Sequence, residues 1–139
     1  MEINESSMFH SLRPLMQPEE KILCPVFANI QKDVKRMTHS ASEYAYITVT
    51  SKGRLVLYRF DSSVSHSEAF LLSNVMFGET QKMKNTGVYS AELSFLSDTG
   101  IQEDINFAVE PKPKGRTELF PNQAKYADKM FSIFDKLLP

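Results

Sequence analysis

The sequence predicts a mainly β protein of the α+β class. We expect a seven-stranded antiparallel partial barrel of two sheets, capped by a C-terminal helix and preceded by a short N-terminal helix. First, seven short β-rich segments separated by turn residues lie between Lys21 and Pro111. Second, apolar residues recur at helical spacing within Asn122–Leu138. Third, a length of 139 residues fits one domain.

The first segment has helical periodicity. Its apolar residues follow one another at three- and four-residue steps: Met8, Phe9, Leu12, Leu15 and Met16. Asn4 is placed to cap the helix, and Pro14 should end or kink it. The spacing predicts a short packing helix over residues 5–13, within an N-terminal helical extension over residues 1–20.

The strands are predicted from β-branched and aromatic residues between turn signals. They cover residues 21–31, 44–50, 54–60, 68–72, 75–84, 88–96 and 101–109. Ser51-Lys52-Gly53 is typical of a hairpin turn, as is Ser97-Asp98-Thr99-Gly100. Because proline cannot donate to a strand ladder, residues 111–116, with two prolines, are predicted to form a solvated linker.

The last segment, residues 122–138, is predicted to be the closing helix. Its expected buried stripe is Tyr126, Met130, Ile133, Phe134 and Leu137, and Asn122 can cap it. Residues 1–139 then form one domain, in which residues 21–111 supply the strands.

Composition narrows the partners and the compartment. The net charge is −1, which gives no global basic field, so we expect no nucleic-acid partner. No apolar run approaches the roughly 20 residues of a membrane span, and the acidic start Met1-Glu2 is unlike a signal peptide. We therefore expect a cytoplasmic protein. The single cysteine, Cys24, lies among apolar neighbours and is predicted to be buried.

No catalytic or metal-binding arrangement emerges from the sequence. His10, His39 and His66 lie far apart, and none has the spacing that places two ligands on one helix face. The adjacent carboxylates Glu19-Glu20 and Glu103-Asp104 are predicted to lie on solvated faces. We therefore expect no catalytic residues, no metal, no cofactor and no enzyme activity.

The order of elements and several short motifs resemble the bacterial pleckstrin-homology-like (PH-like) family. The motifs are the N-terminal Leu12–Met16 leading to Glu19–Ile22, the hairpin Val49–Tyr58 and the segment Phe70–Val75. The resemblance implies a partial barrel closed by the last helix. It leaves the function open, because this fold hosts lipid binders, peptide binders and assembly modules.

One group of cations matches the place where the resemblance implies a ligand. In this fold the first two loops form the mouth that holds phosphoinositide head groups. The candidate anion- or lipid-binding residues are Lys32, Lys35, Arg36, Lys52 and Arg54. The sequence departs from the lipid-binding pattern, which places a basic–x–Arg pair in strand two, since Tyr44–Val49 carries no cation. An anionic head group, a phosphate or a membrane surface is therefore the alternative partner.

We expect a protein partner, and self-assembly into a homo-oligomer, as the main function. A partial barrel leaves open strand edges and a groove beside the last helix, and strands four and one lack lysine in their apolar stretches. The candidate interface residues are Phe70, Leu72, Phe77, Met83, Phe120 and Phe131. A wider buried stripe would instead hide Phe120 and Phe131 in the core.

A third function class is a small-ligand carrier or an enzyme with an internal cavity. Large side chains are expected to fill the barrel and leave no room for such a ligand, namely Phe27, Tyr46, Phe95 and Phe107.

Overall fold

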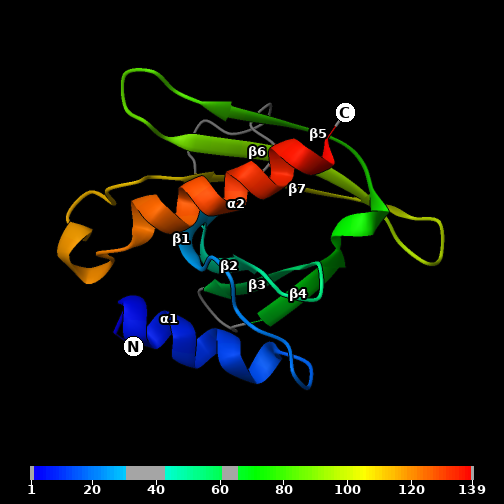
Figure 1. Cartoon of the computed structure of the whole chain (residues 1–139), viewed down its shortest axis with the longest axis horizontal. Helices are drawn as coiled ribbons and strands as arrows, with labels where there is room; N and C mark the ends of the chain where they lie inside the picture. Colours follow the sequence, from blue (N-terminus) through cyan, green and yellow to red (C-terminus); the bar gives the residue numbers. More distant parts are fainter. Residues whose placement is uncertain (1, 31–42, 61–65, 139) are drawn as a thin grey trace.

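A computed structural model describes residues 2–30, 43–60 and 66–138, except the side chain of His66. The elements run in the order α1 (Glu5–Leu12), η1 (Arg13–Leu15), β1 (Val26–Ile30), β2 (Glu43–Val49), β3 (Arg54–Phe60), β4 (His66–Leu71), η3 (Leu72–Asn74), β5 (Val75–Lys82), β6 (Tyr89–Leu96), β7 (Gln102–Val109), η4 (Thr117–Leu119) and α2 (Gln123–Leu137). The predicted seven antiparallel strands, C-terminal helix and short N-terminal helix are confirmed (Figure 1).

The strands form one continuous sheet in the order β4-β3-β2-β1-β7-β6-β5. The first and last strands meet through a short ladder, Asn29 opposite Ala108 and Ile30 opposite Phe107. Because β1 bonds to both β2 and β7, hydrogen bonding passes through all seven strands without the predicted division into two sheets. The sheet is open between its edge strands, β4 and β5; we call this gap the seam.

Turn residues set the hairpins as predicted. Thr50 donates its N–H to the carbonyl of Arg54 at 2.9 Å, and Gly53 supplies the positive φ of 70° that the β2–β3 turn requires. At the N-terminus, the Asn4 side chain accepts the N–H of Ser7 at 2.7 Å and caps α1, which is also as predicted.

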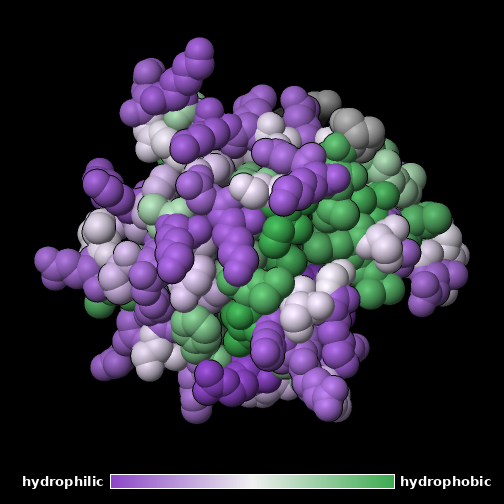
Figure 2. Space-filling model, viewed as in Figure 1, coloured by the Kyte–Doolittle hydropathy of each residue, from purple (hydrophilic) through white to green (hydrophobic). Residues whose placement is uncertain are grey.

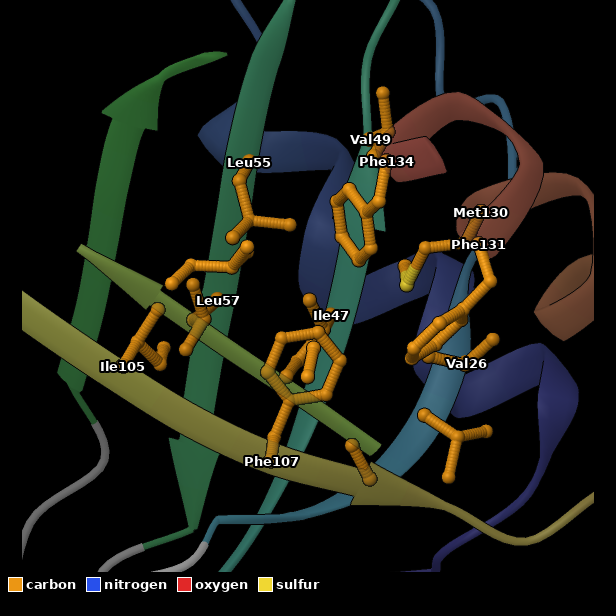
Figure 3. Packing of buried hydrophobic residues seen from close by; sticks show 14 of the residues in the cluster. Val26, Ile47, Val49, Leu55, Leu57, Ile105, Phe107, Met130, Phe131 and Phe134 are labelled. Atoms are coloured by element: carbon orange, nitrogen blue, oxygen red, sulfur yellow. The ribbon is translucent and has the colours of Figure 1, made fainter. Parts of the chain in front are cut away.

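The main core lies on the inner face of the curved sheet. Its buried members come from six of the strands and from α2, and partly buried Val75 adds β5. Met130, Phe131 and Phe134 of α2 point towards the sheet, where β2, β3 and β7 supply residues such as Ile47, Leu57 and Phe107 (Figure 3). The helix therefore fills the concave side of the sheet.

A second core lies on the outer face, where α1 covers β1 to β3. It is built from Met8, Leu12, Phe27, Tyr46, Val56 and Phe120. Alternation along β2 explains both cores: Tyr46 points outward to α1, whereas Ala45 and Ile47 point to α2. The centre of the sheet is therefore buried on both faces. The prediction that Phe27 and Tyr46 fill the barrel interior is wrong, although Phe95 and Phe107 do so.

The buried face of α2 differs from the predicted stripe. Its buried residues are Gln123, Ala127, Met130, Phe131 and Phe134, whereas Tyr126 and Ile133 are half-buried and Leu137 is 41% exposed. Hydrogen bonds from Gln123 to β1, and the small side chain of Ala127, turn this face towards the sheet. Asn122 does not cap the helix with its side chain; it donates instead to Glu5 of α1 at 2.7 Å.

Residues 111–116 were predicted to be a solvated linker, and this is wrong in part. Pro113 is buried, and its carbonyl accepts the N–H of Arg116 at 2.8 Å. The segment is a fixed turn that carries the chain from β7 to η4.

Candidate functional site

At the seam, the backbone N–H and C=O groups of an edge strand lie beside exposed apolar side chains. Phe70 of β4 stacks on Phe95 of β6 across it, with ring centroids 4.8 Å apart. This side-chain contact spans the seam, where no described backbone ladder joins the edge strands, since β4 pairs with β3 and β5 with β6. The outer edge of β4 therefore stays open among the described residues.

The edge of β4 has little charge to protect it. Ser67, Ala69 and Leu71 are exposed, and Leu71 is 47% exposed. Glu68 forms an ion pair with Arg59 of β3. Edge strands usually avoid association through lysine, proline, bulges or inward-pointing charges. The described part of β4 has no lysine, proline or bulge, but Glu68 lies on the same face as buried Phe70 and is an inward-pointing charge, held by Arg59.

Apolar surface continues from β4 towards the end of α2. Figure 2 shows hydrophobic surface gathered where the last turn of α2 approaches η3. Leu72, Val75, Leu137 and Leu138 line a shallow apolar groove there, with Phe134 beneath. Phe95 also lines a hollow of about 260 Å³, whose walls include Leu71 and Leu96 and the acidic residues Asp98 and Glu103.

The other edge, β5, is better protected. A register shift between Val75 and Phe77 marks a bulge, and charged Glu79 and Lys82 lie along the strand. Met76 and Phe77 are exposed at 46% and 55%. Lys82 ends the strand, so Met83 and Lys84 lie beyond the strand that they were predicted to belong to. Bulge and charge together make β5 the poorer edge for pairing.

Strand one is not an edge, which corrects the prediction that it could pair with a partner. It lies between β2 and β7 in the sheet. Strand four is an edge, as that prediction required.

Four of the six predicted interface residues are buried in the single chain. Phe70, Leu72, Phe120 and Phe131 are at most 8% exposed, whereas Phe77 and Met83 are each 55% exposed. Phe131 belongs to the true buried face of α2, and Phe120 stacks on Phe27 in the second core at 5.0 Å. The wider buried stripe, left open by the sequence, is therefore the correct alternative for Phe120 and Phe131.

The predicted cation cluster is only partly described. Lys32, Lys35 and Arg36 lie outside the described residues. Lys52 is exposed at the β2–β3 turn. Arg54 pairs with the buried carboxylate of Glu20, to which its Nε donates at 2.8 Å, and its Nη2 donates to the carbonyl of Leu15 at 3.0 Å. Arg54 is thus already bound within the fold and is not a free phosphate ligand.

The Glu20–Arg54 pair joins the segment after η1 to the start of β3. Hydrogen bonds from Arg54, and then from Thr50 and the Gln17 N–H, hold the pKa of Glu20 at about 2 despite the opposing effect of burial. Glu20 and Glu19 were both predicted to lie on a solvated face, and for Glu20 this is wrong. Its partner, Arg54, is distant in sequence and left no local signal.

A second hollow lies on the outer face, where β1, β2 and β7 meet the turn at residues 113–116. Its walls include Phe27, Asn29, Tyr44 and Arg116. The guanidinium of Arg116 lies over the rings of Phe27 and Tyr44. The sequence analysis missed Arg116 because it treated this segment as solvated linker. The outward alternation of Phe27 and Tyr44 was the one available signal of an aromatic surface.

The described residues contain no group of three or more histidine, cysteine or acidic side chains arranged to hold a metal ion. None of the helices found in the described part of the chain has the length and apolar character that crossing a bilayer requires. A scan against protein-family models gives no match to this sequence, and a search of curated proteins gives none either.

Proposed function

We propose that this chain is a non-enzymatic binding domain of PH-like architecture that acts by binding protein, and that its first partner is a second copy of itself. The observation that carries the proposal is the open edge of β4, which lacks lysine, proline and a bulge in its described part, beside the apolar surface of the seam.

The strand order supports the PH-like part of the proposal. The resemblance implied a partial barrel of seven antiparallel strands closed by the last helix, and a seven-stranded curved sheet with a C-terminal helix on its concave side fits that expectation. Aromatic residues of the inner core, including Phe95, Phe107 and Phe134, occupy the space that a carrier would need for a ligand. Both points favour a function at the surface.

A second copy is the simplest occupant of the β4 edge. Two identical strands can pair antiparallel about a twofold axis, so that residue i of one copy faces residue j of the other and j of the first faces i of the second. Small Ser67 and Ala69, with apolar Leu71, create neither like-charge repulsion nor bulk at such an interface. The hollow beside Leu71 and Leu96 lies next to this edge, and because Asp98 and Glu103 also line it, it suits a polar or cationic side chain of the partner.

The alternative, an anion site at the first two loops, is weaker in one respect. Arg54 is held by Glu20, so Lys52 is the one predicted cation within the described residues that remains exposed.

Light scattering over a hundredfold range of concentration tests the proposal. We expect the mass to rise from 15.9 kDa towards twice that value. Ala69→Lys and Leu71→Lys place a charge on the β4 edge and should each keep the protein monomeric. Leu119→Lys is a matched control, because Leu119 is 43% exposed and lies in η4. Circular dichroism checks that every variant is folded.

A wild-type mass of 15.9 kDa at all concentrations would contradict self-association and leave a partner of another sequence as the remaining form of the proposal. Dimers that persist in both β4 variants would place the interface elsewhere.

A further inference from the structure

We propose that the hollow beside Arg116 is a binding site for a carboxylate group of a small molecule. The hollow has a volume of about 270 Å³ and lies on the outer face of the sheet, away from the β4 edge. Arg116 and Lys114 supply cationic groups to its lining, and Asn29 and Tyr44 supply polar groups.

The guanidinium of Arg116 is held in place by aromatic rings. Its central carbon lies 5.2 Å from the ring centroid of Phe27 and 5.6 Å from that of Tyr44. The two rings are stacked on each other, 5.1 Å apart and within 9° of parallel. Cation–π attraction to such a pair fixes the side chain while leaving N–H groups available at the edge of the guanidinium.

The backbone adds to this preorganisation. The N–H of Arg116 donates to Pro113 at 2.8 Å, and its carbonyl accepts the N–H of Leu119 at 3.0 Å. Buried Pro113 holds this turn against the sheet. A ligand that binds here therefore does not have to order the arginine, which reduces the entropic cost of binding.

The charge of Arg116 is not neutralised within the described part of the chain, where no acidic side chain forms an ion pair with it. One acidic side chain, that of Glu110, is nevertheless close by. The carboxylate of Glu110 also lines the hollow, where it accepts the backbone N–H of Lys114 at 3.3 Å.

Two cations and one carboxylate leave the hollow with a single positive charge. A carboxylate matches this charge and the planar fork of the guanidinium, to which it can bond through both oxygens. A phosphate dianion would exceed the charge and would meet stronger repulsion from Glu110. These two arguments select a monocarboxylate as the ligand class.

Nuclear magnetic resonance at constant ionic strength tests the site, with acetate replacing chloride. We expect saturable shifts of the Arg116 Nε–H and Asn29 side-chain signals, with a Kd on the order of 1–10 mM for so small a probe. Arg116→Gln should weaken binding at least about tenfold, the loss of one charge-assisted contact. Lys125→Gln, which changes an exposed cation of α2 outside the hollow, should leave binding unchanged.

Lys114→Gln is a second variant, free of any role in stacking, and should weaken acetate binding by about two- to fivefold, as expected for an exposed charge. Asn29 shifts that never saturate, or that saturate at the same acetate concentration in Arg116→Gln as in the wild type, would overturn the proposal. Tighter binding of inorganic phosphate than of acetate at equal ionic strength would overturn the assignment to carboxylates.

Discussion

Gln123 bonds to both backbone groups of Phe27. Its Oε1 accepts the Phe27 N–H at 3.0 Å, and its Nε2 donates to the Phe27 carbonyl at 2.8 Å and to the Glu110 carbonyl at 3.1 Å. The β1–β7 register pairs Asn29 with Ala108, so Phe27 and Glu110 would be opposite partners if the ladder continued. The side-chain amide is therefore inserted between the two strands and replaces the missing rung.

Replacing Gln123 should destabilise the fold strongly for a polar residue. Gln123→Met keeps the length of the side chain but leaves the buried N–H and carbonyl of Phe27 without these partners. We expect a loss of about 1–3 kcal/mol in the free energy of unfolding, measured in urea. Lys125→Met, at an exposed position two residues after Gln123 in α2, is the control and should change stability by about 0.5 kcal/mol or less.

The Glu20–Arg54 pair should make stability depend on acid. The folded pKa of Glu20 is about 2, below its ordinary value of 4.5, so its stabilisation is complete above the higher value and is lost as the pH falls towards the lower one. Glu20→Gln should lose about 1.5–3 kcal/mol at neutral pH. Urea unfolding at a series of pH values should show wild type and variant converging in this window. A constant difference between them would contradict the assignment.

The orientation of α2 can be tested with two residues that hydropathy alone treats alike. Phe134 is 1% exposed in the main core, whereas Leu137 is 41% exposed. Phe134→Ala should cost about 3–5 kcal/mol. Leu137→Ala should cost at most about 1 kcal/mol, because the Leu137 side chain is already partly exposed to solvent and its truncation removes little buried apolar area. Thermal unfolding distinguishes the two, and equal losses would mean that the helix faces the sheet differently.

Cys24 should react slowly in the folded protein. It is fully buried, and burial raises the pKa of its thiol to about 11, so the nucleophilic thiolate is scarce at neutral pH. We expect an aromatic disulfide reagent to label Cys24 rapidly in denaturant. In buffer, labelling should be no faster than the local unfolding that exposes the thiol. Rapid labelling without denaturant would contradict this burial.

Local sequence patterns were sufficient for the number and order of the strands, for the turns and for the existence of both helices, although the first strand was predicted from Lys21 and begins only at Val26. The alternation of apolar and polar residues predicts a strand at the same positions, and a turn residue such as Gly53 predicts a turn at its own position. The orientation of α2 was not predictable in this way, because it depends on polar Gln123 finding Phe27 across the whole domain. The pattern of apolar residues along a helix does not reveal that a polar residue such as Gln123 is buried.

The candidate site was predictable in kind but not in detail. The lysine-free stretch of strand four pointed to an open edge, and the structure places β4 at one. The pairing of Arg54 with Glu20 and the stacking of Arg116 on Phe27 join residues far apart in sequence. The residues of each contact become neighbours only after the sheet has folded, so no local sequence pattern predicts them.

The contact between Glu5 and Asn122 has a consequence for synthesis on the ribosome. It joins residues separated by 117 positions, and α2, which fills the main core, is the last element of the chain. A nascent chain can form the β2–β3 hairpin early but cannot bury its aromatic residues until α2 has emerged. Such long-range closure slows folding and prolongs the exposure of strand edges, so we expect the newly made chain to depend on chaperones until α2 has left the ribosome.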